Sequence, residues 1–182
     1  VKFNNNGVRQ WSSYYGGAGV DLGFSCTTDP SGNVFLSGVT SSSASISFMG
    51  FQNAYGLSSD AFLVKFNSSG IRQWATYYGS SGYDEGKSCT TDLFGNVFLT
   101  GQTQSSGLIA TTGSHQYFSG SPLDAYLVKF NSAGVRQWGT YYGGSGDDFG
   151  LACTTDLSGN VCLVGYTQST FSIATASGHQ NS

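Results

Sequence analysis

Residues 124–144 read DAYLVKFNSAGVRQWGTYYGG, and two further copies of this stretch occur in the chain, at residues 60–79 and 1–17. The copies recur every 63 or 64 residues, a spacing set by Trp11, Trp74 and Trp138. Repetition at a fixed period indicates that each copy belongs to one structural unit, which buries its apolar surface against neighbouring units. The architecture therefore has to be worked out from the repeat.

The repeat divides the 182 residues into three units, at roughly residues 1–59, 60–123 and 124–182. Val1 enters the first unit in the middle of the motif, and Ser182 ends the third unit where the preceding repeat continues. We therefore expect the segment to be part of a longer array of repeats. A missing start means that the lack of a signal peptide says nothing about the compartment.

The composition excludes several classes of protein. Charged residues make up 9% of the chain, against about 25% in an average soluble domain, while aromatic residues make up 15% and supply enough apolar area for a core. The net charge is −3, and six of the seven basic residues occupy equivalent places in the repeats, so no basic cluster is available for nucleic acid. No apolar run approaches the roughly 20 residues that span a bilayer.

Six turns share a pattern in which Asn or Asp stands three residues before Gly. Three read N-x-x-G and three read D-x-x-G; they end at Gly7, Gly32, Gly70, Gly95, Gly134 and Gly159. Asn or Asp opens such a turn by bonding the local backbone, and Gly closes it because a positive φ is unfavourable for a residue with a Cβ. A type I turn followed by a left-handed Gly connects the strands of a hairpin. Two hairpins, or four antiparallel strands, are thus predicted in each repeat.

The predicted strands are rich in Val, Phe, Tyr, Thr and Trp, and several are apolar on both faces. In the second repeat they cover Ala61–Phe66, Ile71–Tyr78, Lys87–Thr91 and Asn96–Thr103. A sheet with two apolar faces is expected to lie between two other sheets. Stacked four-stranded sheets at this period are typical of a β-propeller.

The motif pair DAFLVKFNSxGxRQWxTYYG and SCTTDxxGNVFLxGxT resembles the bacterial β-propeller repeat family called SBBP, after seven-bladed beta propeller. The resemblance covers essentially the whole chain and implies blades of four antiparallel strands, on secreted or cell-surface proteins. With the blade strands lettered a to d from the axis outward, the chain would read c-d, a-b-c-d, a-b-c-d, a-b. The predicted fold is therefore all-β, with two whole and two half blades in an incomplete ring.

Three of the four cysteines, Cys26, Cys89 and Cys153, follow the repeat, which indicates small side chains filling one recurring slot. Cys162 takes the place of a core Phe in the other copies. Pairing across the last hairpin sets Cys153 opposite Leu163 and Thr154 opposite Cys162, so the two thiols should face opposite sides of the sheet. This geometry disfavours a disulfide.

A G-x-D-x-G motif follows the fourth strand of each repeat and contains Asp21, Asp84 and Asp148. One interpretation is a cation or sugar site, since Asp and turn carbonyls suit Ca²⁺. The favoured interpretation is a connection between blades, in which Asp caps backbone N–H groups. Asp60 and Asp124, which precede the third strand, could line one end of the propeller, where binding sites gather, but the favoured interpretation is that they form turns.

The aromatic residues also have two interpretations. Trp11, Trp74, Trp138 and the Tyr-Tyr pairs could stack on sugar rings, but aromatics fixed to the repeat at strand ends are more often core. His115 and His179 share a position with Phe51, which favours packing over metal binding or catalysis. No nucleophile–His–acid set and no unique acid pair is evident, so no enzymatic activity is expected.

The leading functional hypothesis is a non-enzymatic structural or adhesive module of a secreted or cell-surface bacterial protein, in an extended or filamentous assembly. Its partners would be further repeats of the same protein or other copies of it, and it would need no cofactor. The alternative is a lectin-like propeller that binds surface glycans through the three tryptophans. Asp21, Asp84 and Asp148 would then hold Ca²⁺.

Overall fold

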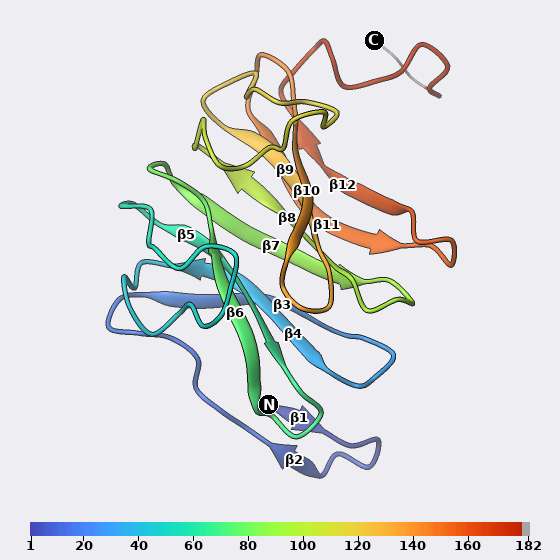
Figure 1. Cartoon of the computed structure of the whole chain (residues 1–182). Helices are drawn as coiled ribbons and strands as arrows, with labels where there is room; N and C mark the ends of the chain where they lie inside the picture. The colour runs from blue at the N-terminus through green and yellow to red at the C-terminus, as the bar shows by residue number, and fades with distance from the viewer. Residues whose placement is uncertain (180–182) are drawn as a thin grey trace.

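The computed structural model describes residues 1–179, which form twelve strands and no helix (Figure 1). Two sheets have four antiparallel strands, in the orders β3-β4-β5-β6 and β7-β8-β9-β10, and two have two strands, β1-β2 and β11-β12. These are the two whole and two half blades expected from the repeat. Figure 1 shows them stacked in chain order from the N-terminal to the C-terminal pair.

The strands recur with nearly constant bounds. They are β1 (Lys2–Phe3), β2 (Arg9–Trp11), β3 (Asp21–Thr28), β4 (Val34–Thr40), β5 (Asp60–Phe66), β6 (Arg72–Tyr78), β7 (Asp84–Thr91), β8 (Val97–Thr103), β9 (Asp124–Phe130), β10 (Arg136–Tyr142), β11 (Asp148–Thr155) and β12 (Val161–Thr167). The six short turns all lie at one end of the sheets, which we call the turn end. The longer connections lie at the other, the loop end, because the strands are antiparallel.

The six turns have the predicted geometry. In the β5–β6 turn, Oδ1 of Asn67 accepts hydrogen bonds from the backbone N–H groups of Ser69 and Ile71, at 3.0 and 2.9 Å. Gly70 closes this turn at a φ of 84°. The predicted register of the last hairpin is also confirmed, with Cys153 opposite Leu163 and Thr154 opposite Cys162.

The first strand of each blade is longer than predicted. The second repeat was expected to begin it at Lys87, whereas β7 begins at Asp84. The glycines suggested a loop, but Gly86 pairs with Gly101 of β8, and a register shift follows it. A Cβ on Gly86 would lie 3.0 Å from the Leu99 side chain, so the missing side chain permits close packing within an extended strand. The G-x-D-x-G motif therefore spans the loop and the beginning of the strand.

The core lies between the sheets, as the two-sided apolar strands indicated. All seven residues of β5 are buried, whereas four consecutive residues at the end of β12 are exposed. β7 contacts both β3 and β11, the corresponding strands of the preceding and following blades. Adjacent blades therefore bury the faces that they share.

A tryptophan links successive blades at the turn end. The indole N–H of Trp74 donates to the carbonyl of Ser132, 3.1 Å away in the turn of the next blade, and Trp11 makes the same bond to Ser68 at 3.0 Å. The rings lie directly on the glycines of these turns. A Cβ on Gly134 would lie 2.8 Å from Cδ2 of Trp74. Gly134 is therefore required both for its backbone conformation and for the contact between blades.

Replacing Gly134 with Ala tests this double requirement. Gly134→Ala is expected to lower the free energy of unfolding by about 2–4 kcal/mol, because it strains a left-handed residue and pushes against the indole. Gly95→Ala is the matched control: Gly95 has a φ of 77°, but a Cβ there would meet nothing closer than 3.7 Å. It should cost only about 1–2 kcal/mol. Equal losses in urea denaturation would show that the Trp74 contact is unimportant.

Candidate functional site at the joints between blades

The aspartate of the G-x-D-x-G motif is a buried hydrogen-bond acceptor at the loop end. Asp84 begins β7 and is 0% exposed. Its Oδ2 accepts hydrogen bonds from the backbone N–H of Ser80 at 2.9 Å and the hydroxyl of Ser105 at 2.7 Å, and its Oδ1 accepts one from the hydroxyl of Thr103. Asp84 thus joins the loop before β7 to the end of β8.

The other two copies of the motif repeat this arrangement. Oδ2 of Asp21 accepts from the N–H of Gly17 at 2.7 Å and the hydroxyl of Ser42 at 2.9 Å. Oδ2 of Asp148 accepts from Gly144 and Ser169, both at 2.8 Å. The capping role expected for these aspartates is therefore present in all three copies. The one difference is Oδ1 of Asp148, which is buried without a hydrogen-bond partner in the described part of the chain.

The serine and threonine partners of these aspartates were missed in the sequence. They form a T-x-S pattern at the end of the second strand of each blade: Thr40 and Ser42, Thr103 and Ser105, Thr167 and Ser169. The pattern recurs with the same period as the aspartates. That shared period is the signal that could have linked them.

The three aspartates lie in three different blades, one in each copy of the motif. Among residues 1–179, no group of three His, Cys, Asp or Glu side chains gathers where it could hold a metal ion. Ca²⁺ takes six to eight oxygen ligands. At Asp84, two hydroxyls and a backbone N–H occupy the carboxylate, so a cation there would have to displace the bond from Ser80.

At two of the three joints, a second carboxylate approaches from the preceding blade. Asp60, the first residue of β5, is 0% exposed, and its Oδ2 accepts from the N–H of Gly56 at 2.9 Å. A Cβ on Gly79 would lie 2.8 Å from Oδ1 of Asp60 and 2.3 Å from Oδ2 of Asp84. The same construction at Gly143 finds Asp124 and Asp148. The prediction of turn formers is too narrow, because Asp60 and Asp124 also face the next blade.

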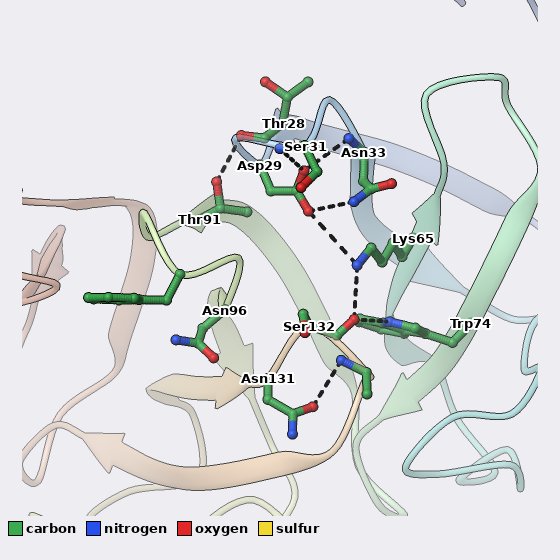
Figure 2. Close-up of polar contacts among 12 residues, drawn as sticks. Thr28, Asp29, Ser31, Asn33, Lys65, Trp74, Thr91, Asn96, Asn131 and Ser132 are labelled. Carbon is green, nitrogen blue, oxygen red and sulfur yellow. Dashed lines mark hydrogen bonds and ion pairs between the residues drawn. The ribbon is translucent and has the colours of Figure 1, made fainter.

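At the turn end, Lys65 reinforces the contact made by Trp74 (Figure 2). Its ammonium group donates to the same Ser132 carbonyl at 2.9 Å and lies 3.8 Å from a carboxylate oxygen of Asp29, in the first turn of its own blade. The hydroxyl of Thr91 donates across the joint to the carbonyl of Thr28, at 2.8 Å. Residues shared by the repeats therefore connect the blades at both ends.

The second tyrosine of a Tyr-Tyr pair bonds across a joint, whereas Tyr77, the first of its pair, bonds within its own blade. The hydroxyls of Tyr78 and Tyr142 donate to the carbonyls of Ile109 and Ile173, at 2.6 and 2.5 Å. Tyr77 donates to the carbonyl of Ser42 at 2.7 Å, and burial raises its pKa to about 12. The phenol of Tyr77 is therefore a neutral donor at physiological pH.

The three tryptophans differ in exposure. Trp74 is 4% exposed and offers no free ring face, whereas Trp11 and Trp138 are half-buried. Trp138 and His115 line a groove of about 480 Å³, together with residues 111–114. His115 lies against Tyr142, with 5.8 Å between ring centroids, and Phe51, at the corresponding position of the first repeat, lies against Phe130 of the next blade; both side chains remain exposed. The packing interpretation of the histidine position is supported at His115.

The cysteines lie where the repeat suggested but are not equally buried. All four are free thiols: Cys89 is buried, Cys153 is half-buried, and Cys26 and Cys162 are exposed. Burial raises the pKa of Cys89 to about 11 and that of Cys153 to about 12. These two thiols stay protonated at neutral pH and are poor nucleophiles.

Comparison with known proteins agrees with this architecture. Residues 73–109 match the family model SBBP, described as a beta-propeller repeat, and no curated protein matches the chain. No helix among residues 1–179 is long and apolar enough to cross a membrane. The matched segment runs from the second residue of β6 through β7 and β8, and its sequence recurs in the other copies. Residues 73–109 are thus similar to a beta-propeller repeat of the SBBP family, and the two whole and two half blades have the form expected of such repeats.

Proposed function

We propose that this chain is a non-enzymatic structural or adhesive module of a secreted or cell-surface bacterial protein. It builds an extended assembly by joining further repeats of the same protein, or other copies of it, at its outermost blades. The observation that carries the proposal is the pair of incomplete blades. β11-β12 supplies strands a and b, while β1-β2 supplies strands c and d.

The two half blades are complementary in register and charge. In both complete blades the second and third strands pair in the same register, from Thr40 opposite Asp60 and from Thr103 opposite Asp124. Lysine on the third strand meets the aspartate of the first turn, as in the Lys129–Asp92 pair at 3.6 Å. Asp156 is the corresponding aspartate of the last half blade, and Lys2 is the corresponding lysine of the first. A strand like β1 added to β12 would restore this ion pair.

The exposure of the last half blade, β11-β12, also supports the docking of a further blade on it. Val164 of β12 is 62% exposed, whereas Ser37 and Thr100 at the corresponding positions are 0% exposed. Thr100 is covered by the next blade, where a Cβ on Gly150 would lie 2.4 Å from its hydroxyl. The exposed apolar face on β12 therefore has the position and chemistry of a surface between blades.

A non-enzymatic role is supported because the polar residues that could act in catalysis make structural contacts instead. The conspicuous aspartates Asp21, Asp84 and Asp148 each accept bonds from a backbone N–H and a serine hydroxyl. His115 packs on an aromatic ring. Display outside the cell is proposed from the resemblance to SBBP repeat proteins and from the low charge content of 9%.

Blocking the exposed face tests the assembly. The purified chain is expected to sediment with a mass that rises with concentration, and Val164→Lys should abolish this rise because it places a charge on the docking face. Leu157→Lys is the control, since Leu157 is 84% exposed and its counterpart Leu93 remains 59% exposed within a complete blade. A wild-type chain that stays monomeric at every concentration, or equal behaviour of the two variants, would refute the assembly.

A glycan-binding role is the second candidate, and the groove beside Trp138 favours it. The half-buried Trp138 ring lies in this groove and offers a surface for stacking on a sugar, while the Thr111 and Thr140 hydroxyls beside it also bond the backbone of Gly139 and Gln116. If this role is real, a glycan array should yield a ligand whose affinity falls at least about tenfold in Trp138→Ala. A Ca²⁺-dependent site would also lose binding with chelator. An array without hits removes this candidate and leaves the structural role intact.

A further inference from the structure

Asp60 is buried at the loop end with one carboxylate oxygen unsatisfied. The side chain is 0% exposed, and its Oδ2 accepts from the backbone of Gly56 at 2.9 Å and the amide of Gln52 at 3.2 Å. Its Oδ1 is buried and has no hydrogen-bond partner in the part of the chain that the structure describes. A buried polar atom without a partner is costly, and it suggests a missing proton, ion or donor.

The unsatisfied oxygen lies near a second carboxylate across the joint. Oδ1 of Asp60 and Oδ2 of Asp84 both lie within 3 Å of the place where Gly79 would carry a Cβ. Asp60 belongs to the blade β3–β6 and Asp84 to the blade β7–β10, so the pair bridges two blades. Two buried carboxylates this close cannot both ionise without a large electrostatic cost.

At the next joint, a hydroxyl supplies the hydrogen bond that Oδ1 of Asp60 lacks. Oδ1 of Asp124 accepts a hydrogen bond from the hydroxyl of Ser121 at 2.7 Å. Leu57 stands at the corresponding place before Asp60, and Ser58 replaces Pro122. The chain therefore carries two versions of one joint, and only the first lacks a donor for the aspartate of the third strand.

The surroundings of Asp60 favour its neutral form. Burial raises its pKa to about 7, the N–H of Gly56 opposes this rise, and the charge of Asp84 adds to it. Burial also raises the pKa of Asp84, against the hydroxyls of Thr103 and Ser105. The other titratable groups facing Asp60 are Tyr55 and Tyr77, and burial raises the pKa of both.

We propose that Asp60 and Asp84 form a proton-binding site in which one proton bridges the two carboxylates, and that loss of this proton weakens the joint between the two complete blades. The proton satisfies Oδ1 of Asp60 and removes the repulsion between the carboxylates. This inference adds pH regulation to the structural role proposed above, and it concerns only residues inside the complete blades.

The sign of the pH dependence follows from the folded and unfolded proton affinities. The folded-state pKa of Asp60 is raised above its ordinary value of 3.8 to about 7, so the folded chain binds more protons than the unfolded chain between these values. Stability therefore falls as pH rises through this window and levels off above it. The Tm of the wild-type chain should drop by about 5 °C or more between about pH 5 and about pH 8.

Asp60→Asn mimics the protonated acid and should remove most of this drop, with a higher Tm than wild type at the alkaline end. Asp147→Asn removes one negative charge outside the pair and should leave the drop unchanged. An unaltered drop in Asp60→Asn would overturn the proposal.

A measurement on the wild-type chain covers the case in which a variant fails to fold. Carbon-13 NMR of labelled aspartate should show one carboxyl that titrates near pH 7. If every aspartate titrates below about pH 5, the proposal is wrong. If adding Ca²⁺ removes the drop in Tm of the wild-type chain between about pH 5 and about pH 8, the pair is a cation site. The proton site is then likewise refuted. Loss of self-association alone would count against the proposed assembly and not against this site.

Discussion

A carboxylate buried where two β-sheets meet must be given hydrogen-bond donors, and much of this structure follows from that requirement. Asp21, Asp84 and Asp148 each begin the first strand of a blade and each accept bonds from a loop N–H and a T-x-S hydroxyl. Each aspartate therefore fixes the end of one strand, the preceding loop and the end of the neighbouring strand together. A residue that seemed available for ligand binding is used to hold the chain in place.

At the turn end, neighbouring sheets are joined by a different set of hydrogen bonds. There the indole of Trp74 and the ammonium group of Lys65 share the Ser132 carbonyl of the next blade, and Gly134 lets the ring approach the backbone. Because both ends of a joint are built from residues that recur with the repeat, one blade specifies how the next one docks. Such a design extends by addition of units, which is the property on which the proposed structural role depends.

Local features were predictable from the sequence because they depend on neighbouring residues. The turn ending at Gly70, the strand Ala61–Phe66 and the division into whole and half blades could all be derived from short patterns and one period. The contacts between blades were harder to predict from the sequence. Asp60 and Asp84 are 24 residues apart and belong to different sheets, so their approach depends on how the blades stack. The beginning of β7 was missed because glycine-rich sequence was taken for a loop, although Gly86 is needed for close packing in a strand.

The central claim is that the shared aspartates hold the blades together, and residue-resolved hydrogen exchange tests it most directly. The backbone N–H groups of Ser80 and Gly144 lie in loops but donate to Asp84 and Asp148. The account predicts that these two amides exchange as slowly as the amides in the centre of β5 and β8, because they open only when a joint opens. Exchange at the rate of an exposed loop would contradict it.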